Sequence, residues 1–141
     1  MADTTRMGPT EGGHPLRTVK ALNDDHGHLV GDTVLRRVAR QIDHASRESD
    51  TVARYGGEEF GVVLPDADTE QALIMADRIR RMIADLEERP TVTVSIGVAS
   101  FPLDGTEPDE IVVAADAALY RSKRAGRNRV TAAAVPHGLA V

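Results

Sequence analysis

The sequence contains no cysteine, which excludes disulfide bonds and cysteine-ligated zinc and is typical of a reducing compartment such as the cytoplasm. Aromatic residues make up only 3% of the chain. The core must therefore be aliphatic, and the few dispersed rings argue against a platform that stacks single-stranded bases. No apolar run approaches the roughly 20 residues of a membrane span, and the first residues lack a signal-peptide core. We expect a cytoplasmic protein with no membrane span in this chain.

Acidic residues outnumber basic ones, but one segment of the chain is purely cationic. The chain has 17 Lys plus Arg against 22 Asp plus Glu, a net charge of -5, so the protein as a whole does not attract polyanions and any anion site must be local. The segment from Arg121 to Arg129 holds five cations and no acid. This segment is either a local anion site or a solvated basic face. A nucleic-acid module using it remains a distant alternative, which the acidic balance and the scarce aromatics oppose, so we expect no nucleic-acid partner.

The 141 residues, 41% apolar and 28% charged, suit one α/β domain with a modest core. Apolar spacing and turn residues predict the elements in order. They are a helix starting at Asp32 as N-cap and running past Ile42, hairpin strands at Thr51–Tyr55 and Glu59–Leu64, a helix from Asp68 to Leu86, a strand at Thr91–Ser100, a helix from Pro108 to Gly126, and a short edge strand at Asn128–Thr131. The second hairpin strand is nearly all apolar, which predicts burial on both faces.

This order of elements predicts the fold class. Helix, hairpin, helix, strand, helix is most of an α+β sandwich of ferredoxin-like split βαβ type, with a mainly antiparallel central sheet flanked by helices. Its opening strand is expected near residues 13–22. We expect a leader without regular structure at 1–15, one domain at 16–133 and a tail at 134–141.

Two glycines followed by two carboxylates stand at the bend of the predicted hairpin. Gly56 and Gly57 form the turn, and Glu58 and Glu59 follow it directly. Acids at a tight turn suit metal and phosphate chemistry, but solvated glutamates after a glycine turn explain the local pattern equally well. The stretch by itself leaves both interpretations open.

Five motifs together carry a family resemblance. They are Arg54-Tyr55-Gly56-Gly57-Glu58-Glu59-Phe60; Asn23-Asp24-Asp25-His26-Gly27-His28 with Gly31-Asp32; Arg47-Glu48-Ser49-Asp50; Thr93-Val94-Ser95-Ile96-Gly97-Val98-Ala99; and Ala115-Asp116-Ala117-Ala118-Leu119-Tyr120 running into Lys123 and Gly126-Arg127-Asn128-Arg129. In this order and spacing they resemble GGDEF domains, the diguanylate cyclases, in the GGEEF form. They span residues 20–130, and each alone is weak.

The resemblance implies a palm-like nucleotide cyclase that condenses two GTP into cyclic di-GMP and releases two pyrophosphates. Phosphoryl transfer depends on positioning and on charge neutralisation, for which the family uses Mg²⁺ or Mn²⁺. Glu58 matches the family's metal carboxylate and can also help to deprotonate the attacking 3′-hydroxyl. Glu59 and Lys20 are the further catalytic positions that the resemblance assigns.

Substrate binding is assigned by the same resemblance to Asn23, Asp32, Gly56, Gly57, Lys123 and Arg127. An amide and a carboxylate at Asn23 and Asp32 suit guanine, whose Watson–Crick edge offers one acceptor and two donors. Glycines in the hairpin turn let the backbone approach phosphates without a Cβ in the way. Lys123 and Arg127 match phosphate-binding positions at a helix end.

Arg47 and Asp50 form an RxxD motif that ends shortly before Gly56. In the family this is the inhibitory product site, where an arginine can grip phosphate or stack on guanine and the aspartate can bond a guanine edge. Arg78 matches the position of a second arginine of that site.

The N-terminal part departs from the family pattern. Counting back from Asn23, Pro15 stands where the family's first strand has its first aspartate, and Arg17 stands at the second. The aspartate that Pro15 replaces is the family's other metal carboxylate, besides the one that Glu58 matches. Proline neither binds magnesium nor donates a ladder hydrogen bond. Three explanations remain open: a truncated domain of low activity, a substitute ligand from Glu11, His14 or Asp24, or a strand supplied by another chain.

Two functional hypotheses follow. The first is a diguanylate cyclase acting as a homodimer, since each protomer holds one GTP and the product is two-fold symmetric. The second is a catalytically impaired domain that binds cyclic di-GMP or GTP as a sensor. Either would be controlled by a sensory domain upstream in a parent protein.

Overall fold

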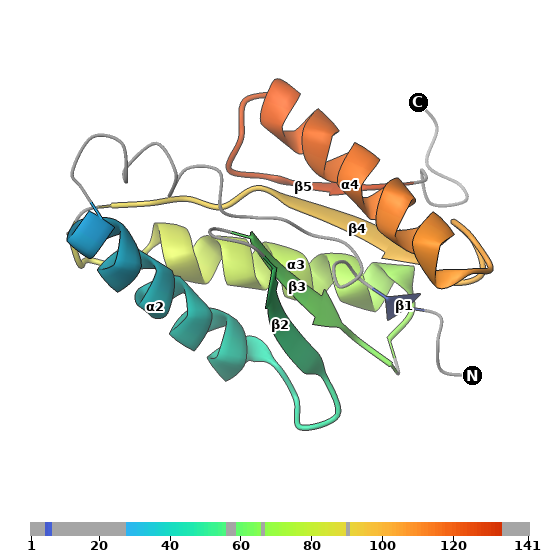
Figure 1. Cartoon of the computed structure of the whole chain (residues 1–141), viewed down its shortest axis with the longest axis horizontal. Coiled ribbons are helices and arrows are strands. Elements are labelled where there is room, and N and C mark those ends of the chain that lie inside the picture. Colours follow the sequence, from blue (N-terminus) through green and yellow to red (C-terminus); the bar gives the residue numbers. More distant parts are fainter. Residues whose placement is uncertain (1–4, 7–27, 56–58, 66, 90, 134–141) are drawn as a thin grey trace.

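The computed structural model describes residues 5–6, 28–55, 59–65, 67–89 and 91–133. The elements are β1 (Thr5–Arg6), α2 (His28–Ala45), β2 (Thr51–Tyr55), β3 (Glu59–Val63), α3 (Thr69–Ala84), β4 (Ile96–Ser100), α4 (Pro108–Arg124) and β5 (Val130–Ala132). Both predicted hairpin strands and all three predicted helices are present (Figure 1). Within these ranges, no helix combines the length and the apolar character that crossing a bilayer requires.

The strands follow the order expected of a split βαβ sandwich. β2 and β3 pair antiparallel, β1 pairs antiparallel with β4, and β5 adds in parallel on the other edge of β4. β1 also lies next to β3, so it stands between the hairpin and β4 (Figure 1). The described strands are therefore mainly antiparallel, as predicted.

One edge of the three-stranded sheet β1-β4-β5 is formed by residues that the sequence did not predict as a strand. Thr5–Arg6 lies within the segment 1–15 that we expected to lack regular structure, so that expectation is wrong at these two residues. The opening strand expected near residues 13–22 lies outside the described residues. The domain boundaries at 16–133 stay a prediction.

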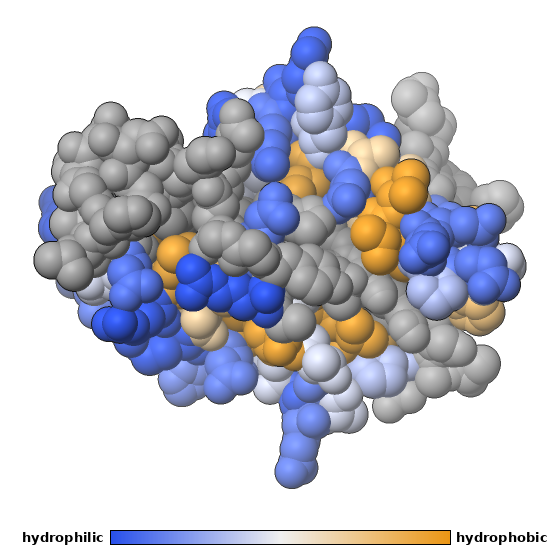
Figure 2. Space-filling view, in the orientation of Figure 1, coloured by the Kyte–Doolittle hydropathy of each residue, from blue (hydrophilic) through white to orange (hydrophobic). Residues whose placement is uncertain are grey.

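The larger core cluster lies between the sheet and helices α2 and α3. It contains Val34, Leu35, Val38, Ile42, Ala45, Phe60, Val62, Leu64, Ala67, Ala72, Ala76, Ile79, Ile83, Val92, Val94, Ile96 and Val98. These residues are aliphatic except Phe60, in agreement with the composition. Exposed large hydrophobics such as Ile74 and Val113 are scattered singly, and the face in Figure 2 shows apolar surface in separate patches among hydrophilic side chains.

Helix α4 covers the opposite face of β4, so every residue of β4 is buried. A Cβ at Gly97 would overlap the backbone carbonyl oxygen of Ala115 and the backbone nitrogen of Leu119, and would lie 3.0 Å from the Leu119 Cα. Only glycine allows helix and strand to approach this closely. The second cluster, Ala99 with Ile111 and Ala115, fills the same layer.

The predicted helix start at Asp68 is confirmed in detail. The Asp68 carboxylate accepts the Gln71 backbone N–H at 2.8 Å, and the Gln71 side chain accepts the Asp68 N–H at 2.9 Å. This is a capping box, in which two otherwise unpaired backbone donors are satisfied reciprocally. It fixes where α3 begins, directly after the hairpin.

Three predicted boundaries are wrong. Asp32 is not the N-cap of its helix, because α2 begins at His28. The strand predicted at Thr91–Ser100 is Ile96–Ser100: residues 91–95 alternate as a strand would, but β4 finds its ladder partners in β1 and β5 only from Ile96 onward. The last strand starts at Val130, because Asn128 has a φ of 50°, which a strand does not accommodate.

Candidate functional site

Strands β2 and β3 stay paired up to Tyr55 and Glu59, the residues on either side of positions 56–58. Arg54 pairs with Phe60 and Tyr55 pairs with Glu59 in the antiparallel register. Phe60 is buried in the larger core, and Glu59 is half-buried at the beginning of β3. The core thus holds the end of the hairpin from which Glu59 projects. Gly56, Gly57 and Glu58, which the sequence predicts as nucleotide and metal site, lie outside the described residues, as do Lys20 and Asn23.

Asp32, the second predicted guanine-binding residue, lies in the second turn of α2. Its carboxylate accepts Arg36 Nη2 at 2.7 Å, in an i,i+4 pair whose side chains are 47% and 71% exposed. Exposed pairs of this kind contribute little stability, typically about 0.3–0.5 kcal/mol. The carboxylate is therefore accessible, and little stability would be lost if Arg36 released it.

Two arginines of the basic segment at the end of α4 contact neighbouring parts of the structure through their side chains. Arg121 Nη2 donates to the backbone carbonyls of Ala132 and Ala133 at 3.1 and 3.2 Å, and the Arg124 guanidinium lies 5.7 Å from the ring centroid of Tyr120. Both contacts are structural. They tie the helix to β5 and to its own preceding turn.

Lys123 and Arg127 lie on either side of the helix end. Lys123 is half-buried in the last turn and Arg127 is exposed in the loop that follows. The helix stops at Arg124, Ala125 caps it, and Gly126 adopts a φ of 126°, which ends the helix near the predicted residue. The C-terminal end of a helix dipole is negative and stabilises nearby cations. The dipole therefore favours both charges at this position even when no ligand is bound.

Arg47 and Asp50 are brought together in a tight turn before β2. The Arg47 N–H donates to Asp50 Oδ2 at 2.7 Å and the Asp50 N–H donates to the Arg47 carbonyl at 2.9 Å. The Asp50 side chain is 0% exposed, whereas the Arg47 side chain is 59% exposed, with 3.8 Å between Nε and Oδ2. The backbone fixes the aspartate and leaves the arginine free to reach a ligand.

Asp50 carries an unsatisfied acceptor. Its Oδ1 is buried and has no hydrogen-bond partner. A buried carboxylate oxygen left unpaired costs free energy, so a donor brought by a ligand would be accepted favourably. Arg78 lies exposed on α3, and among the described contacts it makes no hydrogen bond or ion pair with Arg47 or Asp50.

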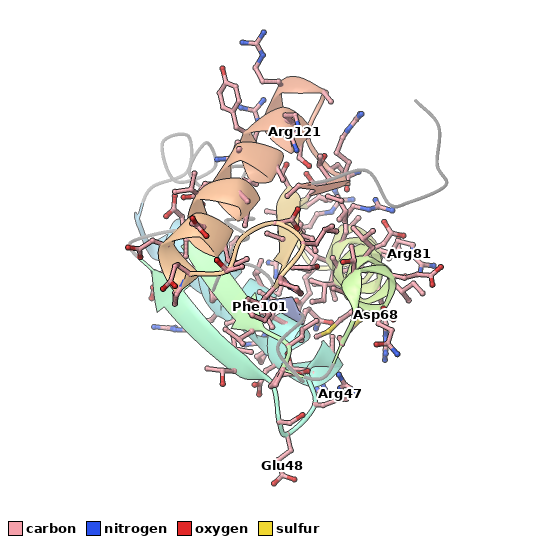
Figure 3. The ribbon with its side chains drawn as sticks, turned by 90° about the vertical axis from the view of Figure 1, so that its right-hand side faces the viewer. Arg47, Glu48, Asp68, Arg81, Phe101 and Arg121 are labelled. Atoms are coloured by element: carbon pink, nitrogen blue, oxygen red, sulfur yellow. The ribbon has the colours of Figure 1, made fainter. Side chains whose placement is uncertain are left out.

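The two charged sites lie at opposite ends of the molecule. Figure 3 shows Arg47 and Glu48 at the loop before β2 and Arg121 on α4 at the other end, and the same separation between that loop and α4 is visible in Figure 1. A ligand at Arg47 and Asp50 therefore does not share contacts with one at the end of α4.

A metal site is not assembled by the described residues. Among them, no group of three His, Asp or Glu side chains lies close enough to hold an ion. The predicted metal ligand Glu58 lies outside the described part of the chain, and the family's other carboxylate position is Pro15. Glu11, His14 and Asp24, which the sequence left open as substitute ligands, lie outside the described residues as well.

Arg80, which the sequence did not mark as a site residue, is connected to the predicted phosphate site through Asn128, which the sequence placed in the last motif and at the start of the edge strand. Arg80 on α3 donates through Nη1 to the Asn128 side-chain oxygen at 3.1 Å, next to Arg127. A left-handed conformation at Asn128 could have been expected, because asparagine adopts it more readily than most residues other than glycine. Nothing in the sequence marks Arg80, because its partner is distant along the chain.

Comparison with known proteins gives consistent matches. The family model described as "Diguanylate cyclase, GGDEF domain" matches residues 16–129. Diguanylate cyclase A of Treponema denticola is 45% identical over 117 residues, covering 79% of this chain and 32% of that protein. The response regulator PleD of Caulobacter vibrioides is 38% identical over 135 residues, covering 86% and 30%. The chain thus spans about a third of the length of these curated relatives.

Solved structures agree with these matches. The GGDEF domain of DgcB from Caulobacter crescentus, in complex with c-di-GMP, has a TM-score of 0.79 at 37% identity and covers 86% of this chain and 75% of that one. The active GGEEF domain of a diguanylate cyclase from Vibrio cholerae has a TM-score of 0.79 at 31% identity, covering 87% and 81%. These neighbours confirm the predicted α+β palm-like fold class.

Proposed function

This chain belongs to the GGDEF family of diguanylate cyclases, and on that premise we propose that it condenses two GTP molecules into cyclic di-GMP. Each of the two steps forms a bond between the 3′-oxygen of one GTP and the α-phosphorus of the other and releases one pyrophosphate. The observation that carries the proposal is the hairpin, whose ladder runs without a break to Tyr55 and Glu59 on either side of Gly56-Gly57-Glu58. Gly56, Gly57 and Glu58 therefore connect the paired ends of the two strands, and we propose that this connection faces the nucleotide.

The proposed roles are divided between the hairpin and the two helix ends. Glu58 deprotonates the 3′-hydroxyl, with support from Glu59 and Lys20, and the glycine backbone at 56 and 57 approaches the phosphates. Asn23 and Asp32 read the guanine edge through an amide and a carboxylate. Lys123 and Arg127 neutralise the triphosphate, which in a protein of net charge -5 requires a local concentration of cations.

A divalent cation fits this scheme through Glu58 alone. When bound, Mg²⁺ or Mn²⁺ would supply charge neutralisation at the transferring phosphoryl group. Glu58 would hold it, together with oxygen ligands from the nucleotide phosphates. With Pro15 at the other carboxylate position, we expect weaker metal binding than a two-carboxylate site provides.

We further propose that Arg47, Asp50 and Arg78 bind cyclic di-GMP as an inhibitory site. The exposed Arg47 can contact phosphate or stack on guanine, and the unpaired Asp50 Oδ1 can accept a guanine N–H. The active form is a homodimer with facing protomers, because the symmetric product needs one GTP from each. A sensory domain in a parent protein would control that association.

The test is synthesis of cyclic di-GMP from GTP and Mg²⁺ by the purified chain at high protein concentration, which favours the dimer. We expect product from the wild type, none from Glu58→Gln, and an unchanged rate from Glu87→Gln, a matched change at an exposed glutamate. Absence of product above background from the wild type would reject the cyclase.

A second candidate function is a catalytically impaired domain that binds cyclic di-GMP or GTP as a sensor. Two observations favour it. Pro15 stands at a metal-carboxylate position, and the hydrogen bonds that shape the site at Arg47 and Asp50 lie within residues 47–50 and involve no residue of the hairpin. Binding of either nucleotide without turnover would support the sensor. Turnover would exclude it.

A further inference from the structure

The loop after α4 holds three consecutive residues in left-handed backbone conformation. Their φ angles are 126° at Gly126, 64° at Arg127 and 50° at Asn128. Glycine adopts this conformation freely and asparagine tolerates it, but for arginine it carries an energetic cost. A strained non-glycine residue persists only where the surroundings over-determine its conformation, so the contacts that hold Arg127 are informative.

The backbone of the loop is anchored on both sides of Arg127. The Arg127 N–H donates to the Ser122 carbonyl at 3.0 Å, and the Ile96 N–H donates to the Arg129 carbonyl at 3.0 Å. Arg129 Nε donates to the Arg127 carbonyl at 3.1 Å. These bonds fix the ends of the loop to α4 and β4 but do not hold Asn128.

Arg80 supplies the missing anchor from a different helix. Its Nη1 donates to Asn128 Oδ1 at 3.1 Å, while its Nε donates to Asp77 Oδ1 at 2.8 Å on the same helix. The Arg80 side chain is only 20% exposed. Asp77 therefore orients the guanidinium, the helix surface confines its stem, and the remaining donor reaches the loop.

We propose that Arg80 is a positioning residue for nucleotide binding, which holds Asn128 and thereby keeps Arg127 in the conformation that contacts the triphosphate. The inference rests on the proposed function, since Arg127 needs a phosphate to contact. It extends the nucleotide site to α3, and it accounts for the strained conformation of Arg127.

Arg81 provides a matched control on the same helix. It also pairs with Asp77, with 3.1 Å between Nε and Oδ2, and its side chain is 61% exposed. Figure 3 shows it on the outside of α3. Removing it takes away the same charge and one bond to the same aspartate, but no contact with the loop.

The experiment is calorimetry of GTP and of guanosine with the whole chain in Mg²⁺. We expect Arg80→Ala to raise the Kd for GTP by about tenfold, in line with loss of a charged hydrogen bond, and to leave guanosine binding within about twofold because the base contacts lie elsewhere. Arg81→Ala should leave both unchanged. Asn128→Gly keeps the left-handed backbone and removes the acceptor at an exposed site, so it should raise the Kd for GTP by the same factor as Arg80→Ala. It tests the proposal even if Arg80→Ala folds poorly.

A double-mutant cycle separates positioning from a general structural effect. In an Arg127→Ala background, Arg80→Ala should cause no further loss of GTP affinity, since it acts through Arg127. Additive losses, an equal loss of guanosine binding, or an equal effect of Arg81→Ala would overturn the inference while GTP binding by the wild type stands. If the wild type binds no GTP, the proposed function is rejected and the inference falls with it.

Discussion

Arg37, in the middle of α2, places its guanidinium 3.0 Å from the Glu88 carboxylate, with the arginine side chain 5% exposed and the glutamate 57% exposed. Arg37 Nη2 also donates to the backbone carbonyl of Arg89 at 2.9 Å. A single buried arginine therefore joins α2 to the segment that leads from α3 into β4. It stabilises the packing of the two helices beneath the hairpin.

This relationship predicts an asymmetric response to mutation. Arg37→Ala should lower the free energy of unfolding by roughly 2–3 kcal/mol, because it removes a packed stem and leaves a carbonyl unpaired. Glu88→Gln should cost about 1 kcal/mol or less, since an exposed acceptor is retained. Urea denaturation measures both. Equal losses would show that the charge of Glu88, and not the arginine's packing, dominates.

Gly97→Ala should be among the most destabilising substitutions in β4. The new Cβ would overlap the backbone of α4, which cannot move as a side-chain end can, so we expect a loss of roughly 3 kcal/mol, at the upper end of overpacking costs. Ala117→Gly, on the exposed face of α4, should cost only about 1 kcal/mol of helix propensity. Thermal unfolding distinguishes them, and a well-tolerated alanine at 97 would contradict the packing described for α4.

Asp77 should contribute stability that disappears in acid. The hydrogen bond from Arg80 is the largest cause that holds the pKa of Asp77 below its ordinary value of 3.8, against an opposing effect of burial. A depressed folded-state pKa stabilises the protein above the unfolded-state pKa, and the contribution is lost as pH falls through the folded value. Wild type should therefore melt above Asp77→Asn at pH 6. The difference should begin to shrink as pH falls below about 4 and should vanish only once pH is below the lowered folded-state pKa of Asp77.

The ionised carboxylate of Asp104 should lower stability, in contrast to that of Asp77. Burial raises the pKa of Asp104 above 3.8, although the Ser100 N–H, which donates to its carboxylate at 2.7 Å, acts to lower it. A raised folded-state pKa favours the protonated form, so the charged form at neutral pH is destabilising. Asp104→Asn keeps an acceptor and should melt above wild type at pH 7, with the gain disappearing as pH falls below about 4. If Asp104→Asn instead melted below wild type at pH 7, the hydrogen bond from the Ser100 N–H would outweigh the cost of burying the charged carboxylate.

Arg47→Ala should abolish binding of cyclic di-GMP as measured by calorimetry with the pure dinucleotide. Arg47 is the exposed partner of the buried Asp50, and in the proposed site it would supply the contact to phosphate or base. Arg40→Ala, an exposed arginine on α2, serves as the control and should leave the heats unchanged. Indistinguishable heats for wild type and Arg47→Ala would reject the inhibitory-site assignment.

Local signals predicted the elements well. The capping box at Asp68 and Gln71 and the proline at Pro108 each specify a helix start through residues within a few positions of it, and the structure confirms both. It also confirms the two predicted hairpin strands on either side of residues 56–58. The prediction failed where partners are distant. Asp32 resembles an N-cap, but α2 continues to His28, and the alternation of residues 91–95 does not reveal that the ladder of β4 starts only at Ile96.

The candidate site was predictable as a set of residues but not as an arrangement. The sequence by itself determined the family, because five motifs at fixed spacing name it, and it identified Arg47 and Asp50 as an RxxD motif. Only the tertiary structure decided that the Asp50 Oδ1 is buried without a donor, that Arg37 reaches Glu88, and that Arg80 reaches Asn128. Local propensity acts over one turn of chain, whereas burial and long-range hydrogen bonds depend on which helices pack together.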